Sequence, residues 1–228
     1  MDRRIWMLRL LKRPFTPLTT PVGRTVPKST AALAGCVTLL VILAAGCGDR
    51  NSEMSYADRV TQERVSRDME MRSDRSVIPP RRRASFRGLQ YFDIDSTYHF
   101  TLPLDRFPST DTVMMAESTG GVAPQVRVGT ISVPFSPERD TLTVFEVTEG
   151  KDRGTLWIPF TDRTNGQTTY ELGRYVDLET VGEDSVAVDF NTAYNPTCAY
   201  NPRYACPIPP DANALSFAVA VGEKTPKF

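Results

Sequence analysis

The sequence predicts a mainly β protein, with a single antiparallel β-barrel or sandwich domain behind an N-terminal tether helix. Two observations lead to this fold class. From Phe86 onward, apolar side chains recur with a period of two in short segments that turn-forming residues separate. No segment between them has the 3.6-residue period of an amphipathic helix, and short strands without intervening helices pack as antiparallel sandwiches or barrels.

The composition is that of an ordinary globular protein, with 40% hydrophobic and 24% charged residues in a chain of 228 residues. The formal net charge of zero conceals a difference between the two ends. Residues 1–46 contain seven Lys or Arg and one acidic residue, which leaves 20 basic and 26 acidic groups from Cys47 onward, a net charge of −6. We therefore expect no nucleic-acid partner.

The first 46 residues have the features of a secretory signal peptide of lipoprotein type. A basic segment precedes the uncharged apolar run 31–45, and small residues lead directly to Cys47. This order resembles a bacterial lipoprotein signal, in which the cysteine thiol is lipidated and becomes the mature N-terminus. We expect lipid on Cys47, a membrane as partner through that lipid, and a location in the cell envelope outside the cytoplasm.

Two alternatives remain for this segment. Leu33-Ala-Gly-Cys36 matches the lipoprotein motif better by letter, but cleavage there would leave residues 37–45 as an exposed apolar tail. A retained transmembrane anchor is the second alternative, although an apolar run of about 16 residues is shorter than the ~20 that a spanning helix needs. A lipid anchor and a transmembrane anchor both place the following residues outside the cytoplasm.

Residues 47–83 predict a charged tether that is partly helical. Nothing in the range 54–72 interrupts a helix. The apolar positions of that range make only a ragged stripe, formed by Tyr56, Val60, Val65 and Met69. We expect a solvated helix that holds the β domain, residues 84–228, off the membrane. The three arginines 81–83 could contact anionic lipid or form a charged linker.

Within the β domain the sequence predicts ten short strands. They cover residues 89–94, 98–102, 112–116, 125–135, 141–147, 155–160, 168–172, 174–178, 185–190 and 215–221. Turn sequences such as Gly150-Lys151-Asp152 and Asn165-Gly166 separate them. Alternation is clear in the last segment, where Phe217, Val219 and Val221 alternate with two alanines.

One segment, residues 189–213, cannot form a helix or a long strand, because it contains five prolines and four asparagines. It also holds Cys198 and Cys206, for which we predict a disulfide in an oxidising compartment. Zinc binding and thiol catalysis are weaker explanations, since zinc takes four ligands and the chain has a single histidine, His99. We expect no metal and no cofactor.

Polar residues in and before this segment are candidates for ligand binding: Arg174, Tyr175, Asp189, Asn191, Tyr194, Asn195 and Tyr200. In a functional interpretation they line a pocket in which arginine grips a carboxylate or phosphate and tyrosine packs against a ring or sugar. In a structural interpretation the asparagines form turns and the tyrosines cap the domain. The sequence leaves both interpretations open.

These segments also carry a resemblance to a known family. Gly173-Arg-Tyr-Val-Asp177, residues 189–201 and residues 206–213 are similar to the family catalogued as domain of unknown function 1684. Supporting segments are Phe86-Arg-Gly-Leu-Gln-Tyr-Phe92, Phe160-Thr-Asp-Arg-Thr-Asn-Gly166 and Gly222-Glu-Lys224. The resemblance implies a single mostly β domain that occurs behind different N-termini, and it implies no activity.

No hydrolase, zinc-protease, phosphate-loop or dinucleotide motif is present in the sequence. We therefore expect a membrane-anchored envelope lipoprotein that acts as a ligand-binding or interaction module, with a small molecule or an envelope protein as its partner. One alternative is a small hydrolase that uses carboxylates around Arg174 and Asp189. Another is a purely structural envelope component.

Overall fold

The computed structural model of the protein describes residues 54–135 and 140–228. The predicted signal peptide and the lipidation site Cys47 lie outside the described residues. The described residues form one compact unit, so helix α1 (Tyr56–Arg72) belongs to the same unit as the strands. In the described part of the chain, no helix has the length and hydropathy that crossing a membrane requires.

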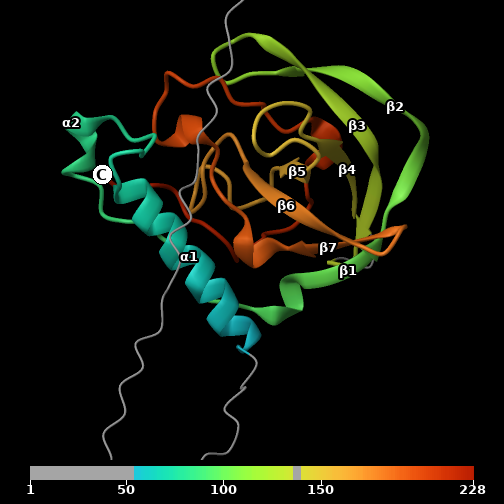
Figure 1. Ribbon diagram of the computed structural model, residues 1–228, viewed down its shortest axis with the longest axis horizontal. Helices are drawn as coiled ribbons and strands as arrows, with labels where there is room; N and C mark the ends of the chain where they lie inside the picture. Colours follow the sequence, from blue (N-terminus) through green and yellow to red (C-terminus); the bar gives the residue numbers. More distant parts are fainter. Residues whose placement is uncertain (1–53, 136–139) are drawn as a thin grey trace, which may run out of the picture. The chain divides into compact units, whose positions relative to one another are not determined.

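Seven strands form one antiparallel sheet in the order β1-β7-β6-β5-β4-β3-β2 (Figure 1). The strands are β1 (His99–Pro103), β2 (Asp105–Ala116), β3 (Val122–Val133), β4 (Asp140–Glu146), β5 (Leu156–Phe160), β6 (Arg174–Val181) and β7 (Ser185–Asp189). Every neighbouring pair runs antiparallel. The predicted mainly β, antiparallel fold is confirmed.

The sheet is rolled, because its two edge strands follow one another in the chain. β1 and β2 stand at opposite ends of the strand order, yet only Leu104 separates them. Figure 1 shows the chain passing from β1 directly into the curved β2. The two edges therefore meet end to end without a ladder of hydrogen bonds between β1 and β2, so the sheet is barrel-like but not a closed barrel.

The main core lies on the inner face of the rolled sheet. β5, the middle strand of the order, is buried at all five positions, whereas β7 alternates between buried and half-buried positions. Leu215, Val219 and Val221 from the C-terminal segment also belong to this core. Burial of these apolar surfaces is the main stabilising contribution to such a domain.

Three of the ten predicted strands, residues 89–94, 168–172 and 215–221, do not form. In the last of them the alternation reflects burial, since Val219 and Val221 pack in the core. Their backbone groups bind side chains instead of a neighbouring strand. Arg174 donates to the carbonyls of Val219 and Val221, and the carboxylate of Asp162 accepts from the N–H of Val219. The segment therefore shows the alternating pattern of a strand without forming one, because buried side chains make the hydrogen bonds of the Val219 and Val221 backbone.

Helix α1 packs against the sheet and is not the solvated tether that its charge predicted. Ser55 caps the helix by accepting from the N–H of Asp58 at 3.2 Å. Val60 is buried, but Val65 and Met69 of the expected apolar stripe are 52% and 59% exposed. Only the N-terminal half of the predicted stripe therefore faces the domain.

Polar contacts hold α1 in place. Arg64 donates to the carbonyl oxygens of Phe92 and Asn191, at 2.8 and 3.0 Å. At the first turn of the helix, the hydroxyl of Tyr56 donates to the carboxylate of Asp189 at 2.8 Å. A helix that docks through polar contacts of this kind needs no continuous apolar face. Its sequence therefore shows no hydrophobic period that would reveal the docking.

A second, smaller core lies at the other end of α1. It consists of Met71, Ile78, Phe86 and Tyr200. The short helix α2 (Pro80–Arg83) lies beside it, and Arg82 donates to the carbonyl of Tyr200 at 3.2 Å. This cluster joins the helical segment to the proline-rich segment near the C-terminus.

Gly173→Ala should destabilise the domain by displacing β6. Gly173 has φ +98°, and a Cβ there would lie 2.7 Å from the carbonyl oxygen of Phe160 and 2.6 Å from the Cγ of Pro209. We expect the free energy of unfolding to fall by at least about 2 kcal/mol. Urea denaturation of the chain from Gly48 onward, which contains the described unit, measures this loss.

Gly182→Ala is the matched control. Gly182 also has a positive φ of +66°, but no atom lies within 4 Å of its would-be Cβ. Its replacement should cost only about 1 kcal/mol, the cost of a left-handed backbone for alanine. Equal losses in the two variants would show that the contacts around Gly173 are unimportant.

Candidate functional site

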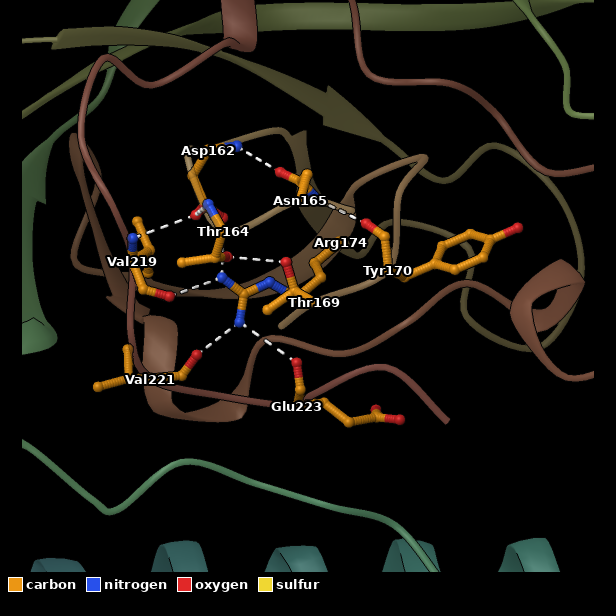
Figure 2. Close-up of polar contacts among 9 residues, drawn as sticks. All are labelled: Asp162, Thr164, Asn165, Thr169, Tyr170, Arg174, Val219, Val221 and Glu223. Atoms are coloured by element: carbon orange, nitrogen blue, oxygen red, sulfur yellow. Dashed lines mark hydrogen bonds and ion pairs between the residues drawn. The ribbon is translucent and has the colours of Figure 1, made fainter. Parts of the chain in front are cut away.

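Arg174, the residue expected to grip an anion, is sealed inside the domain. Its Nη2 pairs with the carboxylate of Asp162 at 2.9 Å, and neither side chain is exposed to solvent. The guanidinium also donates to the carbonyls of Val219, Val221 and Glu223, at 2.8, 2.5 and 3.4 Å (Figure 2). This corrects the expectation of a ligand-binding arginine, because a solute cannot reach it and its hydrogen bonds hold the C-terminal segment.

The loop between β5 and β6 presents Asp162 to Arg174. The N–H of Thr164 donates to the Asp162 carboxylate at 2.7 Å, and the hydroxyls of Thr164 and Thr169 are 2.7 Å apart. Asn165 donates to the carbonyl of Tyr170 at 2.5 Å across the same loop (Figure 2). These bonds hold the loop that carries the carboxylate in a fixed shape, which lowers the entropic cost of the ion pair.

Glu223 and Asn195 form a second buried polar cluster. The Glu223 carboxylate, which has no solvent exposure, accepts from the backbone N–H and the side-chain amide of Asn195, at 3.1 and 2.8 Å. Arg67 of α1 lies 3.7 Å from the same carboxylate. Burial raises the pKa of Glu223 to about 7, although Arg67 and the hydrogen bonds from Asn195 oppose the shift. Asn195 is therefore a structural residue beneath the helix.

Asp189 and Asn191 hold the first turn of α1. The Asp189 carboxylate accepts from the Tyr56 hydroxyl and from the N–H of Asn191, both at 2.8 Å. The buried side chain of Asn191 accepts from the N–H of Asp95 and donates to its carbonyl, both at 2.8 Å. Asn191 is thus fully engaged inside the domain, whereas Asp189 is only half-buried.

The three candidate tyrosines lie in different places. Tyr175 is buried, donates its hydroxyl to the carbonyl of Pro207 and packs edge-on against Trp157. Tyr200 is buried in the smaller core. Only Tyr194 is partly exposed, and its hydroxyl donates to the carboxylate of Asp177 at 2.9 Å. Of the seven predicted residues, Asp189 and Tyr194 therefore reach an open surface.

That surface is a groove of about 740 Å³ between α1 and the strands β1, β6 and β7. Four carboxylates line it: Glu63 from α1, Asp177 and Glu179 from β6, and Asp189 from β7. Two guanidiniums, Arg59 and Arg67 of α1, face them. Three rings complete the lining, those of Tyr56, His99 and Tyr194. The groove therefore combines a net negative charge with aromatic surface.

The electrostatics of the groove are only partly balanced. Desolvation, followed by repulsion from Asp189 and Glu179, raises the pKa of Glu63. Desolvation also raises the pKa of Asp177, and the hydrogen bond from Tyr194 opposes it. Both carboxylates would thus gain from an additional hydrogen-bond donor or positive charge.

The aromatic rings are held by neighbours within the groove. The rings of Tyr56 and His99 stack with centroids 5.2 Å apart and an interplanar angle of 7°. The guanidinium of Arg67 lies 4.5 Å from the centre of the Tyr194 ring. These contacts orient both ring systems before any ligand enters.

Cys198 and Cys206 lie side by side but are not joined. Both are buried free thiols, so the predicted disulfide is not found. The N–H of Cys198 donates to the sulfur of Cys206 at 3.0 Å. A hydrogen bond between the two side chains lowers the pKa of the Cys198 thiol and raises that of Cys206. Among the residues that the structure describes, no three His, Cys, Asp or Glu side chains gather to hold a metal ion.

Sequence reasoning missed the groove because one of its walls is α1. Asp177 and Glu179 gave a signal, since they are exposed on β6 on either side of the buried Leu178. Alternation of this kind marks only a solvated face of a sheet. The docking of α1, through Arg64 and Tyr56, turns that face into a groove.

Glu223→Gln tests the buried carboxylate beneath α1. The ordinary pKa of this group is 4.5, and burial raises it to about 7 in the folded protein. Between these values the folded state retains a proton that the unfolded state has released. The contribution of Glu223 to stability is therefore full below pH 4.5 and is lost as the pH rises through about 7.

Urea unfolding at about pH 5 and pH 8 measures this effect. Between the two pH values the wild type should lose up to ~3 kcal/mol more stability than the Glu223→Gln variant. Glu183→Gln, at an exposed position, is the control and should follow the wild type. Parallel pH profiles for the wild type and Glu223→Gln would contradict the assignment.

Comparisons with known proteins place the chain in a family. No curated protein matches the chain. A solved structure that is similar is the solution NMR structure of an uncharacterised protein of Haloarcula marismortui, with 32% sequence identity and a TM-score of 0.57. The match covers 73% of this chain and 92% of the Haloarcula chain. A family model described as "Protein of unknown function (DUF1684)" matches residues 84–224. The chain therefore belongs to the DUF1684 family.

Proposed function

We propose that this protein is an envelope lipoprotein whose β domain binds a small ligand in the groove between α1 and the strands β6 and β7. The observation that carries the proposal is the groove itself, which joins about 740 Å³ of open volume to convergent polar and aromatic side chains. The ligand that suits this lining carries amino or hydroxyl groups and a flat or apolar part.

Charge supports this ligand class. Four carboxylates and two guanidiniums line the groove, so an ammonium group or several hydroxyl donors find acceptors there. Burial raises the pKa of Glu63 and of Asp177 although Arg59 and Arg67 oppose the shifts, so a cationic or hydrogen-bond-donating ligand would stabilise both carboxylates. Tyr194, whose ring already packs against the guanidinium of Arg67, adds aromatic surface to the groove lining.

The groove does not favour the anionic ligand that Arg174 suggested in the sequence. The guanidinium of Arg174 is buried against Asp162. The alternative of a hydrolase with carboxylates around Arg174 and Asp189 loses support for the same reason, since Arg174 cannot contact a substrate. Asp189 is in addition occupied by Tyr56 and Asn191. Binding is therefore the function that the geometry supports best.

Anchoring rests on the N-terminal sequence. The apolar run 31–45, followed by small residues and Cys47, supports export and lipid attachment. An exported position would give the groove access to small solutes of the cell envelope.

Thermal-shift measurements on the chain from Gly48 onward test the groove. Spermidine and glucosamine, as amine probes, should raise the melting temperature, whereas citrate should not, because it adds negative charge beside Glu63 and Asp177. The double variant Glu63→Gln, Asp177→Asn should weaken amine binding at least about tenfold, since it removes two acceptors.

The matched control is Glu183→Gln, Asp184→Asn, which removes two exposed carboxylates from the β6–β7 turn outside the groove. This variant should bind the amines as the wild type does. A shift with citrate alone, or equal binding by both double variants, would refute the assignment of the groove.

Metabolic labelling with an alkynyl palmitate tests the anchor separately. The full chain expressed in a bacterium should incorporate the label and remain with membranes, because lipid attaches to the Cys47 thiol. Cys47→Ser should abolish the label, while Cys36→Ser should not. Labelling that survives Cys47→Ser would overturn the lipoprotein assignment and leave the groove assignment untouched.

A further inference from the structure

Six cations lie in three segments of the chain that contact one another, and none of the six lines the groove. They are Arg75, Arg81, Arg82, Arg87, Arg203 and Lys227, named here the basic face. Five of them are exposed and Arg82 is half-buried. In residues 54–135 and 140–228, none of the six forms a salt bridge. Asp74, the residue before Arg75, pairs with Arg83.

Specific contacts bring three separate segments together to form this face. The N–H of Arg87 donates to the carbonyl of Lys227 at 3.1 Å, and the guanidinium of Arg82 lies 3.7 Å from the centre of the Phe228 ring. Asn201, two residues before Arg203, donates to the carbonyl of Val77 at 3.0 Å. Figure 1 shows the C-terminus beside α2.

The basic face contrasts with the rest of the protein. From Cys47 onward the chain has 20 basic and 26 acidic groups. Without the six cations, 14 basic and 26 acidic groups remain, a net charge of −12. The six cations therefore form a basic part of an acidic protein, whereas the groove carries a net negative charge.

Exposed aromatic side chains accompany the cations. Phe228 is 36% exposed and packs against Arg82, and Tyr204, next to Arg203, is 46% exposed. Aromatic side chains among basic residues are typical of segments that lie at a membrane–water interface. The face therefore offers both components of interfacial binding, charge attraction and aromatic insertion.

We propose that the basic face binds the surface of an anionic phospholipid bilayer. Clusters of four to eight Lys or Arg are sufficient for such binding, and the face has six. A bilayer contacts one surface of the protein only, whereas a long polyanion would extend over the strongly acidic remainder and be repelled. The inference does not depend on lipid at Cys47, nor on a ligand in the groove.

Cosedimentation with vesicles tests the proposal, using the chain from Gly48 onward so that no lipid anchor contributes. Vesicles of phosphatidylcholine with about a third phosphatidylglycerol should bind the protein, and vesicles of phosphatidylcholine alone should not. Raising the salt to about 0.5 M should release the protein, because the attraction is screened.

The triple variant Arg81→Glu, Arg87→Glu, Lys227→Glu should lose on the order of 100-fold in vesicle affinity. The matched control, Lys151→Glu, Arg153→Glu, Arg163→Glu, makes the same charge change at exposed positions outside the face and should lose far less. Urea midpoints show whether both variants are folded. Should the triple variant unfold, Arg81→Glu alone should still lose roughly fivefold.

Three results would overturn the proposal: no binding to the anionic vesicles, equal binding to both kinds of vesicle, or equal losses in the two triple variants. Binding to heparin without binding to vesicles would also overturn it, since the face would then recognise a polyanion and not a bilayer.

Discussion

The buried ion pair between Arg174 and Asp162 is the interaction on which the described domain depends. A desolvated guanidinium is costly, and the cost is offset because Asp162 and three backbone carbonyls surround it. Arg174 also binds the C-terminal segment 219–223, which has no partner strand. That segment ends in Glu223, which contacts Asn195 and approaches Arg67 of α1. One chain of polar contacts thus connects the sheet to the helix.

Helix α1 connects two surfaces of opposite charge. Its residues from Tyr56 to Arg67 line the acidic groove, and the segment after its last turn carries four of the six cations of the basic face. The proposed solute-binding groove beside this helix and the proposed membrane-binding face beyond its end would suit a protein held at a lipid surface. The family model begins at residue 84, so the strand wall of the groove lies within the matched range and the helix wall lies before it.

Several features could be predicted from the sequence, and others could not, for identifiable reasons. Period-two patterning found six of the seven strands over most of their length and part of β2. The same pattern was misleading at residues 215–221, because buried valines alternate there while Arg174 replaces the partner strand. Among the candidate site residues, Asp189 and Tyr194 line the groove, whereas Asn191 and Asn195 bond within the domain. Residue type indicated polarity but not the direction in which each side chain points.

The sequence by itself determined the antiparallel β class, the family and the unusual character of the proline-rich segment, because these depend on local periodicity and on motifs contiguous in the chain. Only the tertiary structure decided that Arg174 is structural, that α1 docks through polar contacts and that Glu63 meets Asp177 across a groove. Those facts join residues that are distant in sequence, and side-chain contacts at such distances leave no local pattern.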